Sequence, residues 1–555
     1  MRFDFSKIFL SYGVNYCTDD LPLNLMLEHL DFGPDNDMRE MGRYISTELI
    51  ESATYIDHYA RPILKTWDLL EGRMDGVWLS KDHYRILQKL QEFGTVRKIF
   101  SSRNLMYHFV SGYLISDSGI FCTLTLTAQT AYALWKYADD GTRESFLPKF
   151  LEPDNPWYGA TYYSEIQGGS DLGSNSTAAE NRNGKWEVNG SDKYFASNAG
   201  IADGSIVTAR IAGAPSGAKG ISIFFVPALR RDGKSNYRIR RLKDKLGTVA
   251  VPTGEVELES SEAYLLGDTK NGIYQALELL TISRIDDALA AVGMARKALW
   301  EAYLYAAKRK AFGKAIIEHP LLKRDFLEME SDLEGALILS LLAARNFSLA
   351  IESRPPYDDT YHYARMLSHI AKNMASETGS EITRYMLEVI GGKGFFAEFP
   401  MEKFHRDAIV TSIWEGTSNI QALDLLEILS RKHTHERLFS DLFALADVFH
   451  DSELRDRILN RIRETRRDVV SLLQSDKPEF YGKDIIGRLG HITAAVHLTA
   501  VAERSGSAEL RTAAEIYSIR HVEKGEVLRP EILARGETLN WMLQRGDNMK
   551  RGNKE

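Results

Sequence analysis

The order of local sequence patterns constrains this fold more than any other feature: helical, then β-rich, then helical again. Apolar residues recur at helical spacing from about residue 21 to 150, as in DHYRILQKLQEFG. Short β-type runs punctuated by Gly, Asn, Asp and Pro, such as GSIVTARIAG, fill about 157 to 268 and predict a compact all-β domain. From about residue 272 the helical pattern returns in longer segments rich in Ala and Leu, which is typical of a bundle whose helices contact several neighbours.

These patterns predict an α+β multidomain chain, and its length of 555 residues suits three or four folding units. The units expected are, in chain order, an N-terminal helical domain (1–156), a middle β domain (157–268), a helical bundle (269–435) and a C-terminal helical extension (436–555). No internal repeat or low-complexity linker interrupts this order. The tail after Arg545 is expected to be frayed.

Charge and cysteine content exclude several classes of protein. The formal net charge of −8 gives no general electrostatic reason to bind nucleic acid. Cys17 and Cys122 are too few for a disulfide framework or a zinc site, so no metal is expected and a reducing compartment is the simplest interpretation. The N-terminal segment lacks the apolar core of a signal peptide, and no run of ~18 apolar residues would span a membrane. We expect a cytoplasmic protein.

A lone carboxylate stands in the otherwise uncharged stretch IWEGTSNIQ, just before a helical segment. Glu415 lies between Trp414, which can exclude water, and Gly416, which allows a tight turn. A carboxylate held in such dehydrated surroundings has a raised pKa and can act as a general base. The alternative is a structural role, in which Glu415 only complements the helix N-terminus and Thr417 or Ser418 caps it.

A second candidate site is the stretch YYSEIQGGSDLGSNS (residues 162–176), where the helical pattern gives way to β-type runs. Its small and hydroxyl residues and adjacent glycines allow a ligand to approach the backbone closely and to accept bonds from N–H groups. It is neither a Walker loop nor a dinucleotide fingerprint, because it lacks the terminal Gly-Lys-Ser/Thr of the one and the GxGxxG of the other. An ordinary surface turn is the alternative.

Four segments together resemble signatures of the acyl-CoA dehydrogenase flavoproteins. They are, in chain order, YSEIQGGSDLG, KYFASNAG (193–200), RKAFGKAIIEHP (309–320) and EVIGGKGFFAEFPMEKFHRDA joined to IWEGTSNIQ. The resemblance implies that family's fold: an all-α N-terminal domain, a β-barrel-like middle domain and a C-terminal helical bundle, here followed by an extra helical domain. This extension of about 120 residues and the local words RRLKDKLG, QGG and IWEG resemble the AidB-like branch.

This resemblance implies an FAD-dependent acyl-CoA dehydrogenase that oxidises a fatty acyl-CoA of medium or long chain and passes electrons to an electron-transfer flavoprotein or a similar acceptor. By motif position Glu415 is the base that removes the α-proton, while the β-hydrogen leaves as hydride to flavin N5. An acyl-CoA oxidase, which reoxidises its flavin with oxygen, is not separated by sequence. The other alternative is an AidB-like flavoprotein with weak dehydrogenase activity and a nucleic-acid-associated or damage-response role.

Motif positions also assign the residues around the cofactor and the substrate. Those expected to bind FAD are Tyr162, Ser164, Gly169, Ser170, Phe195, Ser197, Arg309, Phe312, Gly391, Gly392, Trp414, Thr417 and Asn419. Those expected at the substrate are Ser170, Arg284, Glu415 and Gly416. Arg309 and Phe312 match residues that reach the FAD of a neighbouring subunit, which implies a homo-oligomer, a tetramer built as a dimer of dimers. Read alone, Phe195 and Phe312 would be core aromatics, and the pair of glycines an ordinary helix stop.

Several positions differ from the family pattern. Ser283 stands where some relatives carry the base, and it cannot act as one. Asp286 and Asp287 lie close by but are expected to be helix-surface or ion-paired groups. Glu388 and Pro320 each replace a Gln that usually helps to bind the adenosine half of FAD, so the adenine pocket is the least defined part of the assignment. Glu388 would repel a pyrophosphate unless it turns away or pairs with a nearby Arg.

The C-terminal extension carries one basic run, RILNRIRETRRD, in which Arg463 and Arg467 share a helical face, as do Arg457 and Arg461. Residues 446–555 nevertheless hold 19 Lys and Arg against 18 Asp and Glu, so acids interleave with the cations. Nonspecific DNA binding draws mainly on clustered cations that neutralise phosphates. A solvated or intersubunit helix face is therefore favoured, and DNA association is the minority hypothesis.

Overall fold

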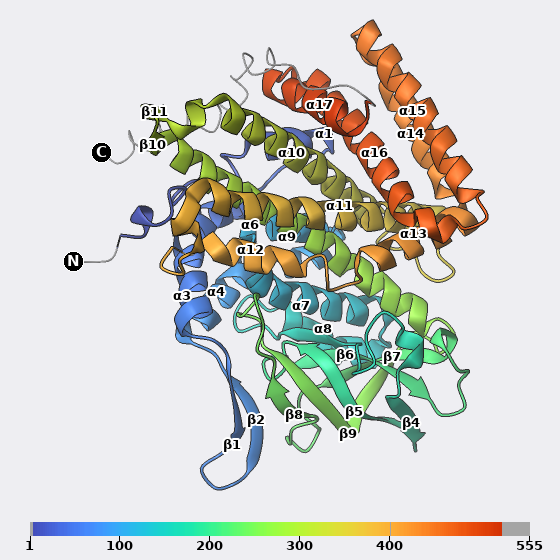
Figure 1. The fold of residues 1–555 in the computed structure, drawn as a ribbon. Helices are drawn as coiled ribbons and strands as arrows, with labels where there is room; N and C mark the ends of the chain where they lie inside the picture. The colour runs from blue at the N-terminus through green and yellow to red at the C-terminus, as the bar shows by residue number, and fades with distance from the viewer. Residues whose placement is uncertain (1–3, 400, 524–555) are drawn as a thin grey trace.

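The computed structural model describes residues 4–399 and 401–523, and within them the predicted helical, β, helical order is confirmed (Figure 1). In Figure 1 the β domain lies below the helices, next to α7 (Ser118–Tyr137) and α8 (Asp140–Leu151). α7 contacts both the first strand of this domain and the long helix α9 (Gly272–Lys308). It therefore lies between the sheet and the helical bundle.

Short helices make up most of the N-terminal region. They are α1 (Leu21–His29), α2 (Asn36–Tyr44), α3 (Ile50–Tyr59), α4 (Lys81–Glu92), α5 (Arg97–Ser102) and α6 (Met106–Ile115), with a π-helical turn at Ile45–Leu49. The side chains of Asp20, Asp35 and Ser80 accept backbone N–H bonds at the starts of α1, α2 and α4, as N-cap residues do.

A hairpin of β1 (Ile63–Trp67) and β2 (Arg73–Trp78) interrupts these helices and was not predicted. In Figure 1 it projects from the end of α3, away from the helices. Its two strands have only five and six residues, too few to stand out from a surrounding helical pattern.

The middle region folds into a seven-stranded sheet that closes on itself. Its strands are β3 (Gly159–Tyr162), β4 (Ala178–Arg182), β5 (Lys185–Ser197), β6 (Gly204–Ile211), β7 (Ile221–Pro227), β8 (Arg238–Leu242) and β9 (Thr253–Leu266). They pair in the order β3-β6-β4-β5-β9-β7, with β8 on β9, and β7 returns to pair with β6. Closure of this kind makes a barrel, which removes free sheet edges. The interior is a separate apolar core that includes Val188, Val207, Phe224 and Val256.

The helical bundle is built around α9, which is buried on nearly all sides along its 37 residues. A helix that is buried on all sides needs neighbours on every face. α10 (Pro320–Leu349) and α11 (Asp359–Ile390) pack against α9 and against each other. A 3-10 turn (Gly391–Phe395) then leads to α12 (Met401–Val410) and α13 (Ser418–Lys432). After α9, the two-residue strands β10 (Lys310–Ala311) and β11 (Lys314–Ala315) form a small hairpin.

The C-terminal extension consists of α14 (Thr434–Asp447), α15 (Ser452–Leu473), α16 (Gly482–Ser505) and α17 (Ala508–His521). α16 and α17 pack on α10, and their apolar residues join the same core as the bundle. Among the helices described, only the segment Pro478–Ser505 is long and apolar enough to cross a bilayer, and 78% of its most apolar window is buried inside the protein. The predicted fraying after Arg545 concerns residues outside the described ranges.

Candidate active site

A small cavity lies between α7 and α9, beside the turn that joins α12 to α13. Its lining residues on each helix follow a spacing of three or four, so each helix presents one face to it. They are Ser118, Phe121, Cys122, Thr125 and Leu126 from α7, Ser283, Asp286, Asp287 and Ala290 from α9, and Trp414 and Glu415 from the turn. The cavity measures about 20 Å³, which is room for about one water molecule.

Glu415 has a left-handed backbone, with φ of +57°, and Gly416 follows at +101°. A left-handed conformation is uncommon for a residue other than glycine and persists where surrounding contacts hold it. Three side chains supply those contacts. The carbonyl oxygen of Glu415 accepts from Arg284 Nε at 2.9 Å and from Gln421 Nε2 at 3.1 Å. That of Gly416 accepts from Gln421 Nε2 at 2.8 Å and from Lys372 Nζ at 2.6 Å.

The Glu415 carboxylate is directed to the cavity and not to the helix that follows it. Ser283 Oγ donates a hydrogen bond to Glu415 Oε2 at 2.7 Å. Burial raises the pKa of Glu415 above its ordinary value, although the Ser283 hydroxyl and nearby cations act in the opposite direction. Thr417 is the N-cap residue of α13, but its side chain makes no capping bond. This placement is the one that a general base requires.

A polar network behind this turn was not anticipated from the sequence. His369 Nδ1 donates to Gln421 Oε1 at 2.7 Å, and burial lowers the pKa of His369 to about 3, so the ring is neutral at pH 7. Arg284 Nη2 pairs with Asp424 at 3.3 Å. Arg284 thus contacts the backbone of Glu415, and its Nη1 is buried without a hydrogen-bond partner among the residues described. Its partners lie on other helices, so no local motif marks them.

The glycine pair after β3 belongs to a turn anchored by a buried ion pair. Glu165 is fully buried and lies 2.9 Å from Lys193 Nζ on β5. It also accepts backbone N–H bonds from Ser176 and Thr177 at 2.7 and 3.1 Å. Burial acts to raise the pKa of Glu165, but Lys193 and these bonds outweigh burial and lower it to about 2. This pair was not predicted, because the Glu of the motif is its only signal in the sequence.

Within this turn, the residues assigned to FAD have different environments. A Cβ atom at Gly169 would lie 2.2 Å from Ser164 Oγ, so a larger residue there would force the Ser164 hydroxyl to rotate away. Gly169 and Ser170 are exposed, and their backbone is open to a ligand. Tyr162 is fully buried in the core of the barrel, so only its backbone faces the turn.

Two predicted cofactor aromatics are surface residues, and the alternative that they fill the core is wrong. Phe195 on β5 exposes 54% of its surface, and Phe312 in the β10–β11 hairpin exposes 94%. Ser197 Oγ lies 3.2 Å from Thr253 Oγ1 on the neighbouring strand. Arg309 is also exposed. In Figure 1 the β10–β11 hairpin lies at the opposite end of the molecule from β5, so the structure does not bring Arg309 and Phe312 to the Phe195 surface of the same chain.

The remaining predicted cofactor residues surround α13 and the end of α11. Gly391 and Gly392 have open space where a side chain would stand. Thr417 and Asn419 are exposed at the start of α13, and Trp414 Nε1 is buried without a hydrogen-bond partner among the residues described.

The two positions that depart from the family pattern have clear local roles. Glu388 accepts a hydrogen bond from Arg384 Nη1 at 2.6 Å. This pairing would reduce the repulsion between the Glu388 carboxylate and a pyrophosphate. Pro320 is the first residue of α10, a position that favours proline because its missing N–H would be unpaired in any case.

The basic run of the extension lies on α15 and is partly neutralised, as its interleaved acids suggested. Arg461 pairs with Glu464 at 2.8 Å and Arg457 with Glu523 at 3.4 Å. Arg463, Arg466 and Arg467 line a surface hollow together with Phe443.

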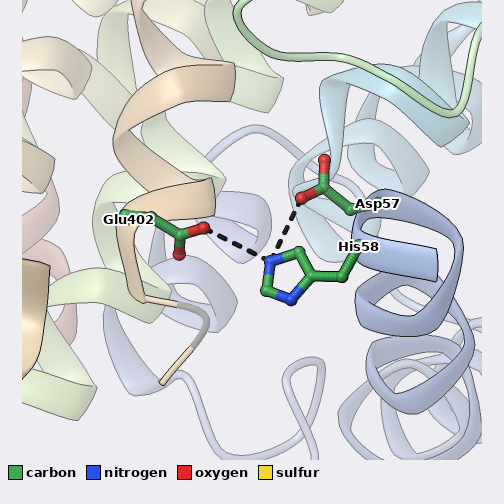
Figure 2. Close-up of side chains that lie close together, drawn as sticks. All are labelled: Asp57, His58 and Glu402. Atoms are coloured by element: carbon green, nitrogen blue, oxygen red, sulfur yellow. Dashed lines mark hydrogen bonds and ion pairs between the residues drawn. The ribbon is translucent and has the colours of Figure 1, made fainter. Parts of the chain in front are cut away.

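One cluster among the described residues has the spacing of metal ligands: Asp57 and His58 on α3, and Glu402 on α12 (Figure 2). His58 Nε2 lies 3.3 Å from both Asp57 Oδ2 and Glu402 Oε1. Arg406 Nη2 contacts the same two oxygens at 2.6 and 3.1 Å. Because the Arg406 guanidinium already pairs with both carboxylates, we assign the cluster to an ion-pair network that joins the two helices.

Comparison with known proteins identifies the family. Residues 160–261 match the acyl-CoA dehydrogenase middle domain, and residues 270–429 match the acyl-CoA dehydrogenase C-terminal domain. AidB of Escherichia coli (strain K12) is 32% identical over 306 residues, or 55% of this chain and 54% of that one. The 3-(aryl)acrylate reductase of Clostridium sporogenes (strain ATCC 15579) is 30% identical over 287 residues, or 51% and 71%. The structure of Caenorhabditis elegans ACDH-11 in complex with C11-CoA has a TM-score of 0.80 at 22% identity and covers 93% of this chain and 92% of its own.

A β barrel lies between two helical regions in the chain, and a carboxylate is directed to a cavity between α7 and α9. The chain belongs to the acyl-CoA dehydrogenase family. Its similarity to AidB agrees with the branch that the local words and the extension predicted, although the match spans only about half of AidB.

Proposed function

We propose that this chain is an FAD-dependent acyl-CoA dehydrogenase, which desaturates the Cα–Cβ bond of an acyl-CoA. Glu415 carries the proposal: its pKa is raised, its left-handed backbone is held by three side chains, and its carboxylate lines a cavity. A base is most effective when its pKa approaches the operating pH, and a dehydrated carboxylate meets that condition for an α-proton that the thioester activates. Family membership supports the same reaction class.

The residues present fit FAD, the cofactor of this family. Phe195 offers an exposed ring on β5, and Trp414 offers a buried indole N–H with no other partner described. Gly169 lies in a turn close to the Ser164 hydroxyl, and the Thr417 side chain makes no capping bond at the start of a 15-residue helix. Glycine turns and helix N-termini suit phosphate groups because they present unpaired N–H donors. When bound, FAD supplies the acceptor for the β-hydride.

The chain's own residues prepare the proton transfer. Glu415 accepts the α-proton, and Ser283 holds its carboxylate on the cavity side. Arg284, Gln421 and Lys372 bond the carbonyls of the turn, so that the carboxylate keeps its direction when substrate enters. Such fixed positioning lowers the entropic part of the barrier. Trp414 covers one side of the carboxylate and limits access of water, which keeps the pKa of Glu415 raised.

We infer that the partners are those of the family: an acyl-CoA thioester and an electron-transfer flavoprotein or a similar acceptor. The exposure of Arg309 and Phe312, far from β5 in Figure 1, supports a homo-oligomer in which each hairpin reaches a neighbour's cofactor. A tetramer and a cytoplasmic location are part of this proposal. Resemblance alone predicts a fatty acyl chain of medium or long length.

Anaerobic titration of the purified holoprotein with acyl-CoAs of graded length tests this function. We expect the visible absorption band of oxidised flavin to bleach with at least one acyl-CoA. Glu415→Gln should lower the bleaching rate by roughly 10²–10⁴-fold, since that is what a positioned base contributes. Glu436→Gln, at an exposed site on α14, is the matched control and should bleach like the wild type. Absence of bleaching with every acyl-CoA, despite bound FAD, would refute the proposal.

The same holoprotein separates the two alternatives. Rapid recovery of the flavin band on admission of air, without an electron-transfer flavoprotein, would identify an oxidase. An AidB-like role would instead give little bleaching together with retention on DNA that weakens as salt is raised.

A further inference from the structure

The cavity beside Glu415 contains two acids that the proposed desaturation does not use. Asp286 and Asp287 are 2% and 7% exposed and line the cavity about one helical turn, ~5.4 Å, beyond Ser283 on α9. Of the expectation that they are helix-surface or ion-paired groups, the ion pair is confirmed for Asp286, which pairs with His108, and the surface position is wrong for both, because α9 runs through the centre of the bundle. An acyl group that reaches past Glu415 therefore meets two carboxylates among the apolar side chains of Phe121, Leu126 and Ala290.

Asp286 is ion-paired on one side only. Its Oδ2 lies 3.1 Å from His108 Nε2, and His108 Nδ1 donates to the Thr95 carbonyl at 2.9 Å. Burial acts to lower the pKa of His108, but Asp286 and the Thr95 carbonyl outweigh it and raise that pKa, which favours the charged imidazolium. Asp286 Oδ1 is buried and has no hydrogen-bond partner among the residues described.

Asp287 has fewer hydrogen-bond and ion-pair partners than Asp286 in the described structure. Its Oδ2 is buried and unbonded in the described structure, and the Trp414 indole beside it also makes no hydrogen bond of good geometry. Burial raises the pKa of Asp287 well above its usual range, and Glu415 and Asp286 raise it further, while Lys372 opposes them. Lys372 uses its hydrogen bond on the carbonyl of Gly416 instead. Asp286 Oδ1 and Asp287 Oδ2 are thus both buried beside this cavity without a hydrogen bond of good geometry in the described part of the chain.

The four acids around this cavity and turn differ in their partners. Asp286 pairs with His108, Asp424 pairs with Arg284, and Glu415 accepts a hydrogen bond from Ser283. Asp287 has no ion pair described, and its Oδ2 is buried without a hydrogen bond of good geometry in the described structure. Buried carboxylates are costly unless paired and hydrogen-bonded. A proton or a positively charged ligand group would stabilise Asp287 in this position.

We propose that the natural acyl group is short and carries a protonated amine, which binds Asp287 and Asp286 at the side of the cavity away from Glu415. This inference rests on the proposed function. One helical turn places the amine a few carbon atoms beyond the α-carbon. A cavity of about 20 Å³ holds about one water molecule, so any acyl group must displace lining side chains, and a short group displaces fewer of them. The rings of Phe121 and Trp414 that line the cavity favour a cation.

A matched pair of thioesters tests the inference on the wild-type holoprotein. 4-(Dimethylamino)butyryl-CoA and 5-methylhexanoyl-CoA have the same shape and differ in a charged N–H in place of a C–H. In anaerobic titration we expect the amine to bleach the flavin with at least about tenfold higher kcat/KM, since hydrogen bonds to charged groups have that effect or more. Equal or better performance of 5-methylhexanoyl-CoA would overturn the inference, as would bleaching by straight-chain acyl-CoAs alone. Failure of every acyl-CoA would refute the desaturation itself.

A substitution adds a second measurement. Asp287→Asn keeps the shape but removes the charge, so the ratio of the two kcat/KM values should fall by about tenfold or more. Asp140→Asn, at an exposed site on α8, is the control and should leave that ratio unchanged. A ratio that is the same in Asp287→Asn and in the wild type would contradict the role of Asp287. If Asp287→Asn does not retain FAD, the wild-type comparison alone decides.

Discussion

Two turns hold the candidate chemistry of this protein, and they are built in opposite ways. The glycine turn of the β domain buries its charged residue, Glu165, against Lys193 and leaves its backbone open to a ligand. The turn in the helical bundle bonds its backbone carbonyls to side chains and directs its charged residue, Glu415, to a cavity. The first turn offers backbone N–H groups, and the second offers a side chain.

The same residue type therefore has opposite pKa shifts in the two turns. Burial raises the pKa of both glutamates, but at Glu165 a lysine at 2.9 Å and two backbone N–H groups reverse the effect. At Glu415 one hydroxyl and more distant cations do not. The number and distance of the donors, more than the degree of burial, separate an acid that holds the structure from an acid that can take a proton.

The largest expected effect comes from the anchor of the glycine turn. Lys193→Met leaves the buried Glu165 carboxylate without its partner and should lower the free energy of unfolding by about 3–5 kcal/mol. Lys185→Met, at the exposed start of the same strand, should change it by no more than about 0.5 kcal/mol. Urea denaturation of the holoprotein measures both. Equal stability of the two variants would show that the pair is no anchor.

The same anchor predicts how stability depends on pH. Because the pKa of Glu165 is lowered from 4.5 to about 2, its contribution is present above pH 4.5 and is lost as the pH falls toward 2. Denaturation at several pH values should show this loss in the wild type and a smaller one in Lys193→Met. Parallel curves for the two proteins would contradict the assignment.

An intermediate effect is expected at the turn of the base. A Cβ atom at Gly416 would lie 2.8 Å from Gln421 Nε2, on a backbone with φ of +101°. Gly416→Ala should therefore cost about 1–3 kcal/mol in stability and, by moving the base, lower kcat by about 10²-fold. Gly506→Ala is the control, because Gly506 also has a positive φ, of +68°, but open space around it. It therefore shows the effect of backbone strain alone, without displacement of the base. Wild-type kcat in Gly416→Ala would show that the turn tolerates movement.

The smallest effect concerns the pH profile of the reaction. The base must be ionised, so kcat/KM should rise with pH through the raised pKa of Glu415. Ser283 donates to the ionised form and lowers that pKa; Ser283→Ala should raise it and shift the acidic limb to higher pH by up to about one unit. Ser340→Ala, which removes a buried hydroxyl bonded within α10, should leave the limb in place. A limb that moves to lower pH would exclude Ser283 as the donor.

The sequence predicted a feature correctly where residues close together in the chain define that feature. The helical, β, helical order follows from periodicity, and the glycine turn and the lone Glu415 follow from short motifs. The sequence did not predict contacts whose two residues lie far apart in the chain. Lys372, Gln421 and Lys193 lie in ordinary stretches, and the β1–β2 hairpin is too short to show a period of its own.

The sequence by itself determined the family, the fold class and the candidate base, because periodicity and motif spacing are properties of neighbouring residues. Only the tertiary structure decided that Asp286 and Asp287 line the cavity of Glu415, and that Glu165 is neutralised while Glu415 is not. These outcomes depend on which side chains reach one another across α7, α9, α11 and the barrel. Burial and charge pairing set pKa values in three dimensions, and the spacing of residues along one chain does not record them.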